Sequence, residues 1–271
     1  MKKIKLSVTC YLYKILLDGK KVLQENVLAI FNNESFAEGN FRKCFLGHIV
    51  DKNKGLVKTN DFPSGKCVIK KYMKNNYLGD YVGDFKSALI AHQCALAFNK
   101  AINVPNMLNF IMPYVTVDIL TMKATYVEPF LEGEFIKFSS NAGFESSNIN
   151  ASIPVAFSHY SWLYFKGKMA VLDVQGVIRN QKYYLTDPAV QSVDLRFGST
   201  DLGASGLIHF LIFHKHNNIC KNWKWVPKQF DALLNNCNAK SIKRTSFSFE
   251  NRKNIEKYTP IYLALLKYVF P

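Results

Sequence analysis

The sequence predicts a two-lobed α+β protein, with a strand-rich first lobe and a mixed second lobe. Short runs rich in Val, Ile, Leu and Tyr, separated by glycines, fill residues 4–72 and are typical of strands. Residues 84–98 carry Phe, Leu and Ala at helical spacing. Strand-like and helix-like runs then alternate. The change of pattern places the hinge between the lobes near residues 128–133.

The elements of the first lobe follow from these runs. An Asp18-Gly19 turn joins the first two strands. We expect Gly39 and Gly47 to interrupt a later strand pair, and Asp84 to begin the helix. The expected strands are 4–17, 21–31, the pair within 36–50, 67–72, 110–117 and 125–130.

The second lobe is expected to begin with a polar loop over 141–150. A helix over 157–165 follows, and then a hairpin-like pair of strands over 169–177 and 181–185. Residues 207–213 are expected to open a helix that runs towards Cys220. The tail combines a basic stretch over 240–248 with an amphipathic end over 258–270.

Composition limits the classes of function. Among 271 residues, 35 Lys and Arg oppose 20 Asp and Glu, so the net charge is +15 and the protein should attract acidic partners such as nucleotide phosphates. The six cysteines form no CxxC pair, and no apolar run is long enough to cross a bilayer. We therefore expect an intracellular, cytoplasmic protein without a membrane partner, whose cysteines are buried or metal-bound.

Oxygen-bearing side chains cluster in two short segments. Asp173 and Gln175 are two residues apart in an expected strand, where such residues face the same way, and Asp187 follows in a turn. Mg²⁺ prefers these oxygen ligands, although aspartates in turns are more often simple turn formers. Lys70 lies in an apolar strand and points either to solvent or to a bound phosphate. Together these groups match the needs of phosphoryl transfer.

A second cluster carries transition-metal ligands. His214, His216 and Cys220 fall within seven residues, and His216 and Cys220 would share one face of a helix. With His159 as a fourth ligand they could form a closed tetrahedral zinc site. The alternative is a histidine-rich helix end with a buried cysteine.

Eight motifs occur in an order that resembles the alpha-kinase family of atypical Ser/Thr protein kinases. The resemblance covers residues 36–227 and includes Asn141 and Gly143 after the third motif. The motifs are Phe36–Arg42, Val68–Lys70, Val127–Phe138, Ala156–His159, Leu172–Gly176, Leu185–Pro188, Gly198–Gly203 and His214–Cys220. The resemblance implies an ATP- and Mg²⁺-dependent kinase of protein Ser/Thr, with threonine the usual acceptor, and a structural Zn²⁺ in the C-lobe.

The resemblance also implies roles for individual residues. Asp173 resembles the catalytic aspartate that faces the substrate hydroxyl, and Lys70, assisted by Arg42, resembles the lysine that holds the ATP phosphates. The remaining roles concern adenine, magnesium and zinc. Glu128 and Leu131 resemble the hinge whose backbone meets adenine, Gln175 and Asp187 the magnesium ligands, and His159, His214, His216 and Cys220 the zinc ligands.

Two residues depart from the family pattern. His216 stands where a cysteine is usual, which keeps a competent zinc ligand but removes one thiolate, and Ala88 stands where glutamine is frequent. Within the expected catalytic domain, residues 1–228, the N-lobe is 1–127, the hinge 128–133 and the C-lobe 134–228. Residues 229–271 form a basic extension.

Three functions remain open at this point. The first is an active kinase with a protein substrate. The second is an impaired pseudokinase or scaffold that binds nucleotide or a partner protein. The third is a basic, zinc-dependent nucleic-acid-binding module, which is disfavoured because the chain lacks paired finger ligands and a recognition helix.

Overall fold

The computed structural model describes most of the chain as two compact units. The first unit comprises Met1–Tyr81 and Ile111–Glu132, and the second comprises Val82–Phe110 and Gly133–Pro271. The described residues are 5–15, 21–32, 34–39, 42–51, 55–56, 64–73, 78–105, 107–118, 124–141, 143–236 and 258–271. The chain passes to the second unit after Glu132, and the segment Val82–Phe110 belongs to that second unit.

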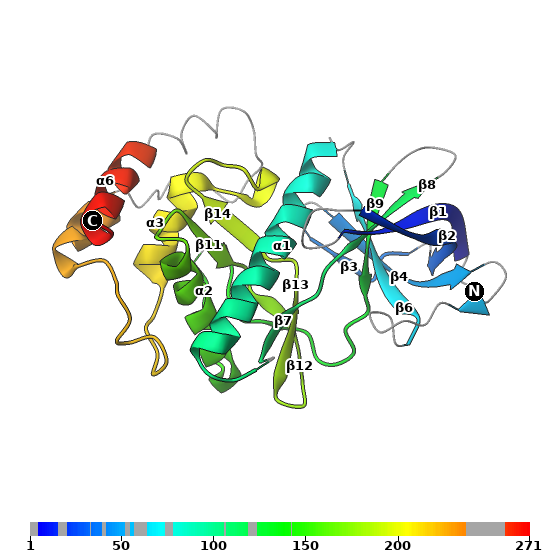
Figure 1. Cartoon of the computed structure of the whole chain (residues 1–271), viewed down its shortest axis with the longest axis horizontal. Coiled ribbons are helices and arrows are strands. Elements are labelled where there is room, and N and C mark those ends of the chain that lie inside the picture. Colours follow the sequence, from blue (N-terminus) through cyan, green and yellow to red (C-terminus); the bar gives the residue numbers. More distant parts are fainter. Residues whose placement is uncertain are drawn as a thin grey trace. The chain divides into compact units, whose positions relative to one another are not determined.

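The first unit is built on one sheet with the strand order β2-β1-β8-β9-β6-β4-β3, and β5 is paired with β4. A further antiparallel pairing between β2 and β4 closes the order on itself (Figure 1). Its strands are β1 (Lys5–Ile15), β2 (Lys21–Asn32), β3 (Ala37–Glu38), β4 (Arg42–Asp51), β5 (Gly55–Leu56), β6 (Lys66–Tyr72), β8 (Tyr114–Asp118) and β9 (Ala124–Pro129). The strand-rich first lobe is thus confirmed, and the expected Asp18-Gly19 turn lies outside the described residues.

Glycine has a different role at Gly47 from the one expected. The residue lies inside β4 and does not interrupt it. A Cβ there would come within 2.7 Å of the Ile30 carbonyl oxygen, so the close pairing of β2 with β4 requires glycine. Beside it, Phe31, Ile49 and Ile69 form part of the buried core of this unit.

The second unit combines helices with two small sheets. Its four-stranded sheet has the order β10-β12-β13-β7, and its two-stranded sheet pairs β11 with β14. None of the described helices is long and apolar enough to span a membrane. The elements are α1 (Leu78–Ala101), β7 (Leu108–Phe110), β10 (Ile136–Lys137), α2 (Ser152–Tyr164), β11 (Met169–Leu172), β12 (Gln175–Arg179), β13 (Lys182–Thr186), β14 (Ala189–Ser192), α3 (Gly203–Phe213), α4 (Asp231–Asn236) and α6 (Thr259–Val269), with short 3₁₀ turns at Ile149–Ala151, Gly198–Thr200 and Lys228–Phe230.

Helix α1 begins six residues before the predicted start, so Asp84 lies inside it. Gly83 weakens the local helix signal, but a Cβ at this position would lie 2.9 Å from the Phe197 carbonyl oxygen. The apolar face predicted for this helix is buried: Ala91, Cys94 and Phe98 join a core that also contains residues of α2, β7 and β13. This core supports β12 and β13, which carry the candidate site.

The predicted pairing of residues 169–177 with 181–185 is only partly right. The extended run breaks at Asp173, and β12 forms the hairpin with β13, whereas β11 pairs with β14. Asp173 has a left-handed backbone, with φ 57°. Aspartate tolerates this conformation better than most residues, so the strand can end at Asp173, the aspartate of the Leu172–Gly176 motif.

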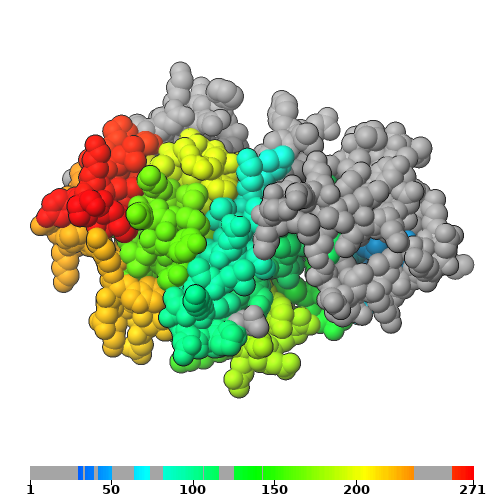
Figure 2. Space-filling view, viewed as in Figure 1, coloured from blue at the N-terminus to red at the C-terminus, as the bar shows by residue number. Residues whose placement is uncertain are grey.

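The end of the chain packs onto the second unit. In α6, the buried residues Tyr262, Leu265 and Leu266 share a core with Trp162 of α2 and Leu207 of α3. Figure 2 shows the red atoms of α6 against their green and orange neighbours. The amphipathic end predicted for 258–270 is confirmed, whereas the basic stretch 240–248 lies outside the described residues.

Candidate functional site

The second unit brings the Asp173 carboxylate and the Gln175 amide together, next to the backbone of Asp187. Gln175 Nε2 lies 3.3 Å from Asp173 Oδ2 and 3.4 Å from the Asp187 carbonyl oxygen. The prediction assumed an extended strand through Asp173, which is wrong, but the two side chains still lie side by side. Mg²⁺ prefers carboxylate and amide oxygens, and Asp173, Gln175 and Asp187 supply such groups from one small region of the second unit.

Both aspartates follow strand ends in an unusual backbone conformation. Asp173 comes after β11 with φ 57°, and Asp187 comes after β13 with φ 51°. Left-handed residues other than glycine cost free energy and are concentrated at functional sites. The pair therefore lies on a backbone that the surrounding strands must hold in place.

A lysine that sequence reasoning did not single out contacts Asp173. Lys137 Nζ of β10 lies 2.6 Å from Asp173 Oδ1, and its side chain is 45% exposed. β10 pairs with β12, so Lys137 lies opposite Gln175 in the sheet. This register places a positive charge beside the carboxylate, and no feature of the local sequence marks it.

The first unit contains Lys70 and Glu128 as a buried ion pair. Lys70 Nζ on β6 lies 2.6 Å from Glu128 Oε2 on β9, and the two side chains are 4% and 8% exposed. The pairing of β6 with β9 aligns Val68 with Glu128 and Lys70 with Tyr126, which places both charged residues on neighbouring strands. Lys70 therefore does not point to solvent. The side chain of Glu128 holds Lys70 in the sheet, in addition to whatever its backbone binds.

The other two residues predicted around the nucleotide also lie in the first unit. Arg42 begins β4 opposite Tyr72, and its guanidinium carbon lies 5.7 Å from the centre of the Tyr72 ring. Leu131 follows β9 and is half-buried, and its neighbour Glu132 forms an exposed ion pair with Lys66 at 3.6 Å.

The four predicted zinc ligands converge in the second unit. One side-chain donor atom from each residue lies within 4.8 Å of those of the other three, and only His216 is exposed. Cys220 Sγ lies 3.6 Å from His214 Nε2 and 3.9 Å from His216 Nδ1. In a tetrahedral zinc site, ordinary Zn–S and Zn–N bond lengths separate sulfur and nitrogen by about 3.6 Å.

The ligands converge through a turn and not through the helix that was predicted to run towards Cys220. α3 ends at Phe213, and His214 is extended with ψ 127°. A turn that begins at Asn217 then brings Cys220 back, since the Asn217 carbonyl accepts from Cys220 N at 3.2 Å and from Lys221 N at 2.9 Å. The Asn217 side chain fixes this turn by donating to the Ser152 carbonyl at 2.8 Å.

His159 has the protonation pattern that a metal ligand needs. Its Nε2 lies 2.9 Å from the Lys224 carbonyl oxygen, so this nitrogen is the donor, and the buried Nδ1 has no hydrogen-bond partner in the described residues. Burial, helped by His214 and His216, lowers the pKa of His159 to about 3. A neutral ring with an unused lone pair fits zinc coordination.

Two groups around the cluster escaped sequence reasoning. Trp225 packs against three of the ligands, with ring centres 4.5 Å from His159, 5.1 Å from His214 and 4.9 Å from His216. Glu145 Oε1 lies 2.7 Å from His214 Nδ1. Trp225 follows the ligand motif closely enough to be suspected, whereas Glu145 is 69 residues from His214 and has no local signal.

Other motif residues shape the scaffold. The buried Asp201 carboxylate accepts from the backbone N–H groups of Ser192, Phe197 and Gly203 and from the Ser192 hydroxyl, so it is a structural anchor. Gly143 has φ 86°, and a Cβ there would lie 2.5 Å from the Phe213 ring. The loop therefore requires glycine at this position.

Comparison with known sequences identifies the family. The model of the alpha-kinase family matches residues 37–220. The chain is 33% identical to alpha-protein kinase vwkA of Dictyostelium discoideum over 69% of its length and 29% identical to eukaryotic elongation factor 2 kinase of Caenorhabditis elegans over 73%. It spans only 29% and 26% of these relatives, about a quarter of their length.

Solved structures show the same fold. The alpha-kinase domain of myosin-II heavy chain kinase A in complex with AMP-PNP is similar, with a TM-score of 0.65 and 25% identity over 79% of this chain and 94% of that one. An alpha-kinase from Entamoeba histolytica has a TM-score of 0.65 and 24% identity over 80% and 90% of the two chains. By its family match, its relatives and its fold, this chain belongs to the alpha-kinase family.

Proposed function

We propose that the chain is an active protein kinase that transfers the γ-phosphate of ATP to Ser or Thr, preferably Thr, of protein substrates. The observation that carries this proposal is the group formed by Asp173, Gln175 and Asp187 on adjoining strand ends of a family member. The AMP-PNP complex of a relative supports nucleotide binding.

Each residue has a role that follows from phosphoryl-transfer chemistry. Lys70 places its charge on the phosphates of ATP, Arg42 assists it, and the backbone of Glu128 to Leu131 meets the adenine edge. Asp173 orients the attacking hydroxyl and accepts its proton. Gln175 and Asp187 would hold magnesium, which when bound supplies positive charge beside the phosphates.

Lys137 has a supporting role in this scheme. Its ammonium group is 2.6 Å from Asp173 Oδ1, so the ion pair restricts the rotation of the carboxylate. A hydroxyl approaching Asp173 would then meet a carboxylate already in place. Lys137 is exposed enough to contact a peptide or a phosphate as well.

The four residues His159, His214, His216 and Cys220 are proposed to hold a structural zinc ion. All four coordination positions are taken by protein, as in sites that stabilise a fold rather than catalyse a reaction. The ion would join α2, which carries His159, to the loop after α3. The zinc ion would thus cross-link the irregular loop after α3 to the rest of the second unit.

The direct test is phosphate transfer from γ-labelled ATP to a basic, threonine-containing protein with and without Mg²⁺. We expect Mg²⁺-dependent labelling on threonine, and Asp187→Asn should raise the Mg²⁺ concentration needed for half-maximal rate. Asp231→Asn, at the start of α4, is the matched control and should leave that concentration unchanged. ATP binding without product in the unaltered protein would contradict the proposal and indicate a pseudokinase.

A further inference from the structure

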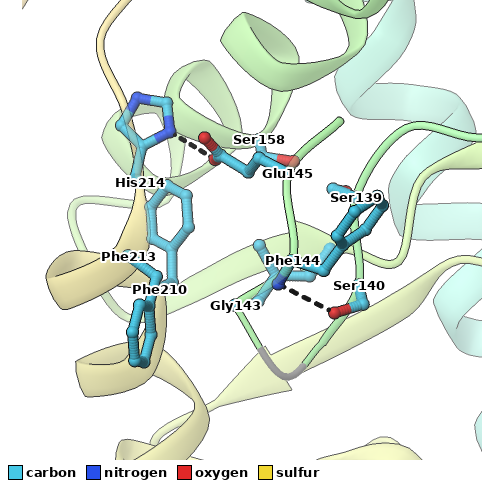
Figure 3. A pocket seen from close by; sticks show the side chains of 10 residues that line it. Ser139, Ser140, Gly143, Phe144, Glu145, Ser158, Phe210, Phe213 and His214 are labelled. Carbon is cyan, nitrogen blue, oxygen red and sulfur yellow. Dashed lines mark hydrogen bonds and ion pairs between the residues drawn. The ribbon is translucent and has the colours of Figure 1, made fainter. Parts of the chain in front are cut away.

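Glu145 contacts the candidate zinc site from outside. Its Oε1 accepts from His214 Nδ1 at 2.7 Å (Figure 3). Its Oε2 accepts from the backbone N–H of Lys215 at 2.9 Å. The His214 side chain is fully enclosed, and that of Glu145 is 10% exposed. Both carboxylate oxygens of Glu145 therefore accept hydrogen bonds from the neighbouring residues His214 and Lys215.

This contact selects the tautomer of His214. With the proton on Nδ1, the lone pair lies on Nε2, the nitrogen that is 3.6 Å from Cys220 Sγ. A carboxylate that accepts from the second nitrogen of a ligating histidine orients the ring and raises its basicity. The hydrogen bond from Lys215 N to Glu145 also holds the backbone of the loop that follows α3.

Glu145 belongs to a short segment that is itself well held. Ser139 and Glu145 form an isolated antiparallel bridge, and Ser146 N donates to the Phe138 carbonyl at 2.8 Å. Between this segment and α3 lies a cavity of about 10 Å³, lined by Glu145, His214 and the buried Ser158, with room for about one water molecule.

The opposite end of the segment reaches the proposed reaction centre. Phe138 N and Ser139 N donate to the Val174 carbonyl at 2.9 and 3.1 Å, and Ser139 Oγ accepts from Val174 N at 3.1 Å. Lys137, one residue earlier, forms the ion pair with Asp173. Ser139, which contacts Val174 beside Asp173, also pairs with Glu145, which contacts His214, so hydrogen-bonded pairs connect the surroundings of the proposed catalytic carboxylate to a proposed zinc ligand.

We infer that Glu145 is a positioning residue that orients His214 for zinc and, through its bridge to Ser139, attaches the segment beside Asp173 to the metal site. The inference rests on the zinc ion and the catalytic role proposed above. Glu145 touches neither ATP nor the substrate hydroxyl in this scheme; it acts through His214 and through Phe138 and Ser139.

The test compares Glu145→Ala, Glu145→Gln and the control Glu134→Ala in the full chain. Glu134 is exposed and precedes the same segment. Zinc affinity is measured by competition with a chelator and by elemental analysis. Glu145→Ala should weaken zinc by about 10–100-fold, Glu145→Gln should recover part of the loss because its amide oxygen still accepts from His214, and Glu134→Ala should match the unaltered protein.

Two further readouts separate positioning from general damage. In the cobalt-substituted protein, Glu145→Ala should shift the ligand-field bands while keeping the thiolate charge-transfer band of Cys220. At saturating zinc, the amides of Phe138 and Ser139 should exchange hydrogen faster in Glu145→Ala but not in Glu134→Ala.

The outcomes separate failure of the proposed role of Glu145 from failure of the proposed zinc site. If the unaltered protein binds no zinc, both the zinc site and the role of Glu145 are wrong. If it binds zinc and Glu145→Ala binds it equally well, within about twofold, with unchanged cobalt bands, only the role of Glu145 is wrong. Loss of zinc affinity with unchanged exchange at Phe138 and Ser139 would overturn the link to Asp173.

Discussion

Lys70 and Glu128 form a buried ion pair, 2.6 Å apart, between neighbouring strands of the first unit. Removing one partner from such a pair leaves an uncompensated charge, whereas removing both does not. The side chain of Glu128 thus supplies a negative charge directly beside the buried Lys70 ammonium group. The pair links the stability of the sheet to a residue proposed to bind phosphate.

Glu128→Leu is therefore expected to lower the free energy of unfolding by about 3–5 kcal/mol. The double variant Lys70→Met/Glu128→Leu should be more stable than Glu128→Leu alone, because no charge is left buried. Urea unfolding of the single and double variants measures both effects. Equal stability of the Glu128→Leu variant and the unaltered protein would contradict the account of this pair.

His216 provides a test of the metal site. His216→Cys restores the residue usual in the family and should retain zinc, since thiolate and imidazole both bind it well. His216→Ala should bind zinc much more weakly, because one of four ligands is lost. Elemental analysis after dialysis against a chelator measures the retained metal. His209→Ala is the control, since His209 is not part of the cluster; equal retention in His216→Ala would remove His216 from the site.

Asp201 should matter for stability rather than for substrate binding. Asp201→Ala leaves three backbone N–H groups without their acceptor and should cost about 2–4 kcal/mol of unfolding free energy. The KM for a peptide substrate, measured well below the unfolding temperature, should stay within about twofold. A large rise in KM without loss of stability would indicate a substrate contact instead.

Tyr262 fixes the C-terminal helix through one hydroxyl. Its hydroxyl oxygen accepts from Trp162 Nε1 at 2.8 Å, its O–H donates to the Gly167 carbonyl at 2.7 Å, and burial raises the pKa of this phenol. Tyr262→Phe leaves two buried polar groups unpaired and should destabilise by about 1–3 kcal/mol. Tyr268→Phe, on the exposed face of α6, should change stability by less than half as much in the same denaturant titration.

The features that depend on the spacing of residues within one segment could be predicted from the sequence. The spacing of His214, His216 and Cys220 indicated the metal cluster, and the repeat of apolar residues through 84–98 indicated α1. Sequence reasoning failed where distant segments decide the structure. The turn at Asn217 depends on the Ser152 carbonyl, and the pairing of β11 with β14 depends on the break at Asp173.

The same limit explains the residues that were missed around the site. Lys137 reaches Asp173 through a sheet pairing, and Glu145 reaches His214 across 69 positions. Glu128 was expected to contribute its backbone, because nothing in a single strand shows which charge lies on the next one. The contacts of Lys137 and Glu128 follow from strand register and that of Glu145 from the packing of distant segments, and motif spacing encodes neither.

The proposed kinase activity depends most directly on Asp173, which would orient the hydroxyl that attacks ATP. Single-turnover phosphate transfer at saturating Mg²⁺-ATP measures this step directly. Asp173→Asn should reduce the rate by about 10²–10⁴-fold while leaving ATP affinity and the unfolding midpoint close to those of the unaltered protein. Transfer by Asp173→Asn at a rate within about threefold of the unaltered protein would contradict the assignment.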